Sequence, residues 1–128
     1  MIVVDASAVV AIVQNEPGYE KLAEKLAAAH PRYISPVSWV EVTLALMRTY
    51  RDAASVADEY MRSANIAIHP IDDQQASLSC AAYLKYGKGR HAARLNLGDC
   101  FSYAAAKALN APLLYVGGDF AKTDAKKA

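Results

Sequence analysis

The chain has 128 residues, of which 54% are hydrophobic and 21% charged, and its formal net charge is +1. This length and apolar content predict one folded domain over residues 1–128 and exclude a disordered chain. The small net charge excludes nucleic-acid binding by a generally basic surface, so binding of a polyanion would need a local patch.

The two cysteines, Cys80 and Cys100, are widely spaced and fit buried thiols in a reducing compartment better than a zinc site. The N-terminus begins with an apolar run and has neither the basic segment nor the cleavage site of a signal peptide. No apolar stretch is long enough to span a bilayer. We therefore expect a cytoplasmic protein without a membrane partner.

The first predicted element is a strand over residues 2–4, an apolar β-branched run typical of a buried parallel strand. Asp5 follows at its carboxyl end, where open α/β sheets bind their ligands. Ser7 is the expected N-cap of a short helix over residues 8–13. A second, amphipathic helix is predicted over residues 19–29 and a second strand over residues 32–34.

Ser35 and Pro36 predict the start of another helix, because proline is tolerated at the first helical position. Its predicted inward stripe consists of Val37, Val40, Leu44 and Met47. Glu41 falls on this stripe, so its carboxyl group must be buried or must face a group that binds it.

The remaining elements alternate in type. The pattern predicts a helix over residues 53–64 and a strand over residues 66–68. Asp72 and Gln75 predict a capping box at the start of a further helix, which ends at Gly87. The apolar residues along this helix are Leu78, Ala81, Ala82 and Leu84. A helix over residues 100–109 and a fourth strand over residues 113–116 complete the chain. This alternation predicts an α/β fold with three α/β/α layers and a central, mostly parallel sheet of four to five strands.

Four acids occupy positions where they are expected to converge: Asp5 and Asp119 follow buried strands, Asp99 lies in the first turn of a helix, and Glu41 can reach in from its own helix. Carboxylates about 4 Å apart repel by about 1–4 kcal/mol per pair. Protonation or a hard divalent cation relieves this repulsion. An all-oxygen set favours Mg²⁺ or Mn²⁺, and therefore metal-assisted phosphodiester hydrolysis.

Each acid also has a purely structural interpretation. Asp5 could cap the following turn, Asp99 could form a capping box with Asn96, and Asp119 could be a turn residue after two glycines. Glu41 could pair with Arg48 or emerge at the surface. The functional hypothesis rests on the four acids taken together.

Several motifs, in order, resemble those of PIN-domain ribonucleases of the VapC type, the toxins of toxin–antitoxin modules. They are Ile2-Val3-Val4-Asp5-Ala6-Ser7, Ser38-x-x-Glu41, Tyr86-Gly87-Lys88-Gly89-Arg90-His91, Leu95 to Phe101, and Gly118-Asp119-Phe120-x-x-Thr123-Asp124. The resemblance covers essentially the whole chain. It implies a Mg²⁺- or Mn²⁺-dependent endoribonuclease, often homodimeric, that a cognate antitoxin neutralises.

By position, the resemblance places the catalytic acids at Asp5, Glu41, Asp99 and Asp119, with Asp5, Asp99 and Asp119 holding the metal. It implies accessory roles for the hydroxyl of Ser7 and for Asp124.

A basic cluster forms the candidate RNA-binding surface; its members are Lys85, Lys88, Arg90, His91 and Arg94. A solvated loop is the alternative. Tyr19, Tyr60 and Tyr83 fall at helical spacing among apolar residues and are expected in the core, and Phe120 is expected beneath the acidic loop.

Two rival functions remain open. One is another Mg²⁺-dependent phosphoryl hydrolase, such as an aspartyl-phosphate phosphatase, which would require a second acid where Ser7 stands. The other is a noncatalytic partner-binding module with a degenerate acid pocket.

Overall fold

The computed structural model describes residues 1–128. Four strands are present: β1 (Ile2–Val4), β2 (Arg32–Ile34), β3 (Ile66–Ile68) and β4 (Leu113–Leu114). The helices are α1 (Ala6–Val13), α2 (Tyr19–Ala28), α3 (Pro36–Leu46), α4 (Ala53–Ser63), α5 (Asp73–Tyr86), α6 (Leu97–Ala108) and a short 3₁₀ helix η1 (Phe120–Lys122). The predicted α/β alternation is confirmed.

The four strands form one sheet in the order β3-β2-β1-β4, and every pairing is parallel. Val4 at the end of β1 pairs with Ile34 of β2 on one side and Leu114 of β4 on the other. The first strand of the chain is therefore central, and the residues that follow β1, β2 and β4 meet at one edge of the sheet.

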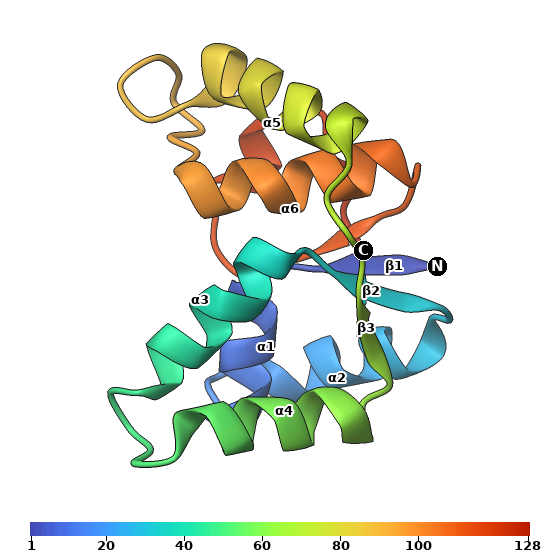
Figure 1. Cartoon of the computed structure of the whole chain (residues 1–128), viewed down its shortest axis with the longest axis vertical. Helices are drawn as coiled ribbons and strands as arrows, with labels where there is room; N and C mark the ends of the chain where they lie inside the picture. Colours follow the sequence, from blue (N-terminus) through green and yellow to red (C-terminus); the bar gives the residue numbers. More distant parts are fainter.

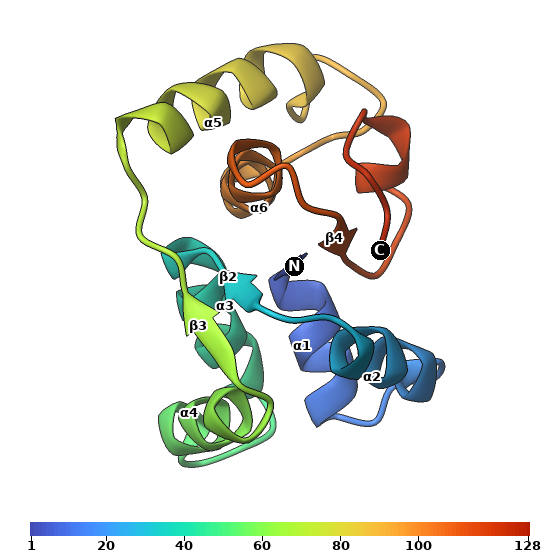
Figure 2. The same ribbon diagram turned by 90° about the vertical axis from the view of Figure 1, so that its right-hand side faces the viewer.

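Helices cover both faces of the sheet, as Figures 1 and 2 show, with α5 and α6 on one side and α1 to α4 on the other. The alternation along β1 divides the core accordingly. Ile2 and Val4 pack into the cluster formed with α1 to α4, whereas Val3 packs against residues of α5 and α6. This arrangement is the predicted three-layer α/β/α fold.

Helix α3 presents a different face to the core from the one that its stripe predicted. Val42 and Leu46 are fully buried, whereas Val40, Leu44 and Met47 are 53%, 58% and 62% exposed. The prediction was wrong because the helix carries apolar residues nearly all round, so that periodicity alone does not select the buried face.

Helix α5 shows a similar difference. Leu84 and Tyr83 are exposed, and Ser79 and Ala82 face the core instead. The capping box expected at its start is half formed: Asp72 accepts a hydrogen bond from the Gln75 backbone N–H, but the Gln75 side chain turns to His69.

Strand β4 is two residues shorter than predicted and ends at Leu114. Tyr115 remains buried, and it packs against Phe120, which lies beneath the following loop as expected. No helix of the chain is both long enough and apolar enough to cross a membrane.

Candidate active site

Asp5 lies at the carboxyl end of β1, and only 4% of it is exposed. Its carboxylate accepts three hydrogen bonds. The Ser7 backbone N–H and hydroxyl donate to Oδ2 at 3.0 and 2.6 Å, and the Ser102 hydroxyl donates to Oδ1 at 2.6 Å. Asp5 rather than Ser7 is the N-cap of α1, so the predicted cap was wrong by two residues. Asp5 therefore caps α1, and this role is compatible with its place in the candidate acid site.

Ser7 connects Asp5 to the segment after β4. Its hydroxyl donates to Asp5 and accepts a hydrogen bond of 3.0 Å from the Val116 backbone N–H. A single hydroxyl thus fixes the position of the carboxylate relative to the loop that leads to Asp119. Figure 2 shows that α1, which contains Ser7, and β4, which precedes Val116, come from opposite ends of the chain.

Two further serines, which the sequence did not single out for a role, extend this network. The hydroxyls of Ser38 and Ser102 lie 2.6 Å apart, and both residues are fully buried. Their spacing carried a signal, because Ser38 lies three residues before Glu41 and Ser102 three residues after Asp99, on the same helical faces as those acids.

The Glu41 carboxyl group lies against Gly98 in the first turn of α6, at a place that a Cβ on Gly98 would occupy. Burial, together with the negative charges of Asp5 and Asp99, raises its pKa to about 7. Glu41 and Arg48 form no ion pair, which rules out that alternative. The charges of Asp5 and Asp99 therefore act on Glu41, and no side-chain cation compensates the negative charge of its carboxylate.

Asp99 is the third member of this group. Its carboxylate completes a capping box with Asn96, at 2.9 and 3.0 Å, so the structural interpretation is confirmed. Burial raises the pKa of Asp99 to about 6; the hydrogen bond from the Asn96 backbone opposes this shift, and the charges of Asp5 and Asp119 add to it. Asp99 therefore caps α6 and also belongs to the acid cluster.

Asp119 lies in the exposed loop between β4 and η1, close enough for its charge to act on Asp99. Gly117 makes the turn before it, with a φ of +98° that favours glycine. The Asp119 side chain makes no capping hydrogen bond. The structure therefore brings all four predicted acids to one edge of the sheet.

A cavity of about 350 Å³ opens beside these acids. It is lined by Ala6, Ser7, Val10, Glu16, Glu41, Ala45 and Val116. The cavity adds one acid, Glu16, that the sequence analysis did not consider. A polar substrate group can thus approach Glu41 from outside the core.

A family model for the PIN domain matches residues 2–126. The chain belongs to the PIN-domain family. Ribonuclease VapC of Mycolicibacterium smegmatis is 40% identical over 123 residues, which are 95% of this chain and 95% of that protein. Ribonuclease VapC30 of Mycobacterium tuberculosis is 39% identical over 123 residues, or 95% of this chain and 94% of that protein.

Solved structures share the fold of this PIN domain at low sequence identity. Mycobacterium tuberculosis VapC20, described as a toxin that cleaves the sarcin–ricin loop, has a TM-score of 0.76 at 19% identity and covers 100% of this chain and 98% of its own. VapBC2 from Rickettsia felis, bound to a promoter DNA fragment, has a TM-score of 0.73 at 17% identity, with 99% and 96% covered.

The PIN family implies a divalent cation, and the donor set of this chain fits one. The four carboxylates lie close enough for their charges to interact, and no cation compensates them, because the only ion pairs of the chain are Arg62–Asp58 and Lys107–Asp124. All donors are hard oxygens. No three acidic or histidine side chains are already gathered in metal-binding geometry. Side-chain rotations would have to complete the coordination shell.

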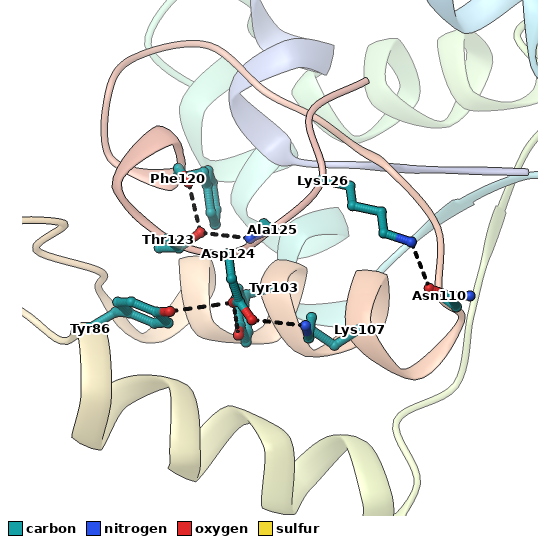
Figure 3. Close-up of polar contacts among 9 residues, drawn as sticks. All are labelled: Tyr86, Tyr103, Lys107, Asn110, Phe120, Thr123, Asp124, Ala125 and Lys126. Atoms are coloured by element: carbon teal, nitrogen blue, oxygen red, sulfur yellow. Dashed lines mark hydrogen bonds and ion pairs between the residues drawn. The ribbon is translucent and has the colours of Figure 1, made fainter.

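Asp124 belongs to a separate cluster, where its partners on α6 are Tyr103 and Lys107, about one and two turns after Asp99 (Figure 3). It accepts hydrogen bonds from the Tyr103 and Tyr86 hydroxyls and from Lys107, the last at 3.0 Å. These hydrogen bonds, that from Tyr103 above all, lower the pKa of Asp124 to about 2. Such contacts anchor the C-terminal segment to α5 and α6, and the accessory role of Asp124 stays a prediction.

The basic cluster spans the last turn of α5, which carries Lys85, and the loop between α5 and α6, which carries the other four residues. All five side chains are exposed. Tyr83, expected in the core, is exposed at the end of α5 as well. Lys122 of η1 donates to the Ala92 carbonyl at 3.4 Å, which places this loop next to the segment that begins with Asp119. The positive loop thus borders the acid cluster on the side of Asp119.

Proposed function

We propose that this PIN domain, residues 1–128, is a Mg²⁺- or Mn²⁺-dependent endoribonuclease and the toxin of a toxin–antitoxin module. One observation carries the proposal: four uncompensated carboxylates from separate segments meet at the carboxyl edge of a parallel sheet. The choice of RNA rests on the curated relatives, which are named VapC ribonucleases.

In this proposal Asp5, Asp99 and Asp119 hold the metal, directly or through water. A bound divalent ion supplies positive charge against the charge that develops on the phosphate oxygens and makes water more acidic. Glu41 borders the open cavity, and its pKa is near neutrality. Glu41 is therefore suited to orient an attacking water and to accept its proton.

The basic loop would hold the RNA backbone. Lys85, Lys88, Arg90, His91 and Arg94 are exposed and lie beside the Asp119 segment. Cationic side chains in such a position bind phosphates without reading the sequence, so that they place the strand across the acids.

A cognate antitoxin and a second copy of the chain are the proposed protein partners. A solved neighbour of this chain is a toxin–antitoxin complex from Klebsiella pneumoniae, at 21% identity and a TM-score of 0.71, covering 97% of this chain and 93% of its own. Exposed apolar residues on α3 and on the α5–α6 pair support coverage by partners. Sedimentation of the purified protein alone tests for the second copy, and sedimentation after co-expression with a candidate antitoxin tests for the complex.

The activity is tested with the Asp5→Asn variant. Asparagine preserves the size of the side chain but removes the negative charge at the centre of the acid cluster, so we expect loss of Mg²⁺-dependent RNA cleavage, by about 10²-fold or more. Purified protein is incubated with transfer, ribosomal and messenger RNA, with and without Mg²⁺, and the cut ends are mapped. Circular dichroism checks that the fold is retained.

Asp52→Asn is the matched control, because Asp52 is an exposed N-cap whose side chain makes no capping hydrogen bond. It should cleave as fast as the parent. Undiminished cleavage by Asp5→Asn would contradict the assignment. Binding of metal without cleavage of any RNA would instead favour the partner-binding module.

A further inference from the structure

We infer that Ser102 and Ser38 are positioning residues that hold the Asp5 carboxylate ready for a divalent cation. This inference rests on the proposed function. The Ser102 hydroxyl lies 2.6 Å from Asp5 Oδ1, and the Ser38 hydroxyl lies 2.6 Å from that of Ser102. Both serines are fully buried, so water does not compete for these hydrogen bonds.

The acceptor at one end fixes the direction of this chain of hydroxyls. A carboxylate only accepts, so the single proton of Ser102 is donated to Asp5. The Ser102 oxygen can then only accept from Ser38, whose proton points toward it. Ser38 therefore polarises Ser102 and acts on Asp5 through it.

The network distinguishes the two oxygens of Asp5. A carboxylate has about four lone-pair positions, two on each oxygen. Both positions on Oδ2 are taken by the N–H and hydroxyl of Ser7, whereas Oδ1 accepts from Ser102 alone. The remaining lone pair is on Oδ1, and Ser102 orients this oxygen for a cation.

The two serines also join three elements of the fold. Ser38 lies in α3, Ser102 in α6, and Asp5 at the end of β1. Glu41 lies three residues after Ser38 and Asp99 three residues before Ser102, nearly one helical turn in each case. The same hydrogen bonds that orient Asp5 therefore set the spacing between the helices that carry two other acids.

The test measures binding of Mn²⁺ alone to the full chain, by calorimetry, in the parent and in Ser102→Ala, Ser38→Ala and the double variant. Loss of an outer-shell partner typically weakens metal binding about 10–100-fold. We expect such a loss for Ser102→Ala and a smaller loss for Ser38→Ala. Because Ser38 acts through Ser102, the double variant should bind no more weakly than Ser102→Ala.

Ser79→Ala is the matched control. Ser79 is also a buried helical serine, but its hydroxyl donates to the Gln75 carbonyl of its own helix, so Mn²⁺ affinity should be unchanged. A merely structural role of Ser102 would lower thermal stability and leave the affinity of the folded protein as it was. The comparison of affinity with stability separates the two roles.

Mn²⁺ affinity within twofold of the parent in Ser102→Ala would overturn the inference, as would a further loss on adding Ser38→Ala. If Ser102→Ala does not fold, unchanged affinity in Ser38→Ala overturns it instead. The Asp5→Asn variant distinguishes failure of this inference from failure of the proposed function. A parent that binds Mn²⁺ no better than Asp5→Asn contradicts the proposed function itself, whereas failure of the serines alone leaves that function standing.

Discussion

Gly98 determines where the Glu41 carboxyl group can lie. A side chain at this position would overlap that carboxyl group, although the backbone conformation of Gly98 is one that other residues can adopt. The glycine is thus needed for close approach rather than for flexibility. Its role was invisible in the sequence, because it depends on how α3 packs against α6.

The Gly98→Ala variant should separate stability from activity. Alanine favours a helix over glycine by about 1 kcal/mol, and the group that it displaces is the mobile end of a side chain. We expect unchanged or higher thermal stability but RNA cleavage reduced about tenfold or more, because Glu41 is pushed away from the other acids. Thermal melts and cleavage rates measure the two effects.

The Glu41→Gln variant provides the control for this prediction. In its background, Gly98→Ala should cause no further loss of activity, because both changes remove the same function. An additional loss of the same size would show that Gly98 acts by another route.

The raised pKa values of Glu41 and Asp99 predict how stability depends on pH. The folded protein holds these protons up to about pH 7 and 6, whereas the unfolded chain releases them near 4.5 and 3.8. Without metal, stability should therefore fall as pH rises from about 4 through 7. We expect the midpoint of thermal unfolding to be a few degrees lower at pH 8 than at pH 5.5.

Two controls apply to this pH profile. At pH 8, Mg²⁺ should raise the unfolding midpoint back toward its value at pH 5.5, because the cation neutralises the carboxylates that have lost their protons. Glu41→Gln should flatten the profile. A parent whose midpoint rises between pH 5.5 and 8 without metal would contradict the raised pKa values.

At the scale of elements, the C-terminal segment is held as an additional edge beside β4. Leu113 forms a parallel bridge with Lys127, and Lys126 reaches Asn110 at 3.0 Å. Asp124 anchors this segment to Tyr103 and Lys107 of α6 (Figure 3). The segment begins just after η1, so its attachment also limits the movement of the loop that carries Asp119.

Replacing Asp124 with Asn should lower the free energy of unfolding by about 1 kcal/mol, a value reduced for the partial exposure of the carboxylate. Its folded-state pKa, about 2, lies below the ordinary 3.8, so its contribution is present above pH 4 and is lost as pH falls toward 2. Urea unfolding at pH 7 and pH 2.5 measures both effects.

Asp58→Asn is the comparison for Asp124→Asn, because Asp58 forms only an exposed pair with Arg62 one turn away. Its cost should stay below about 0.5 kcal/mol. Equal costs for the two variants would mean that the contacts of Asp124 with the tyrosines contribute nothing.

At the scale of the whole molecule, opposite charges are separated although the net charge is only +1. The acids lie at the carboxyl edge of the sheet, and the exposed cations lie in the neighbouring loop between α5 and α6. In the proposed function, this separation would attract the RNA backbone to the loop and a divalent cation to the acids.

Neutralising two cations of this loop, by Lys88→Gln with Arg90→Gln, should weaken RNA binding in the Asp5→Asn background. We expect the slope of log affinity against log salt to fall by about 1.4, or about 0.7 for each lost phosphate contact on a single strand. Fluorescence anisotropy at several salt concentrations measures the slope. Lys21→Gln with Arg51→Gln, two exposed cations elsewhere, should leave the slope unchanged.

The order of the elements, the parallel sheet and the position of the acids along the chain could all be predicted from the amino-acid sequence. These features are local: β-branched runs such as residues 2–4 form strands, and caps such as Asn96 start helices. The convergence of Asp5, Asp99 and Asp119 followed from the rule that parallel strands end at one edge, and the motifs pointed to the PIN family.

The buried faces of the helices and the pairing of distant polar groups could not be predicted, because both depend on how the elements pack in three dimensions. Helix α3 buries Leu46 and exposes Leu44, and its sequence permits either choice. The bond between Ser102 and Asp5 joins positions far apart along the chain, and Asp124 belongs to the C-terminal anchor rather than to the acid cluster. Periodicity reports contacts within an element, whereas these contacts depend on how the elements pack against one another.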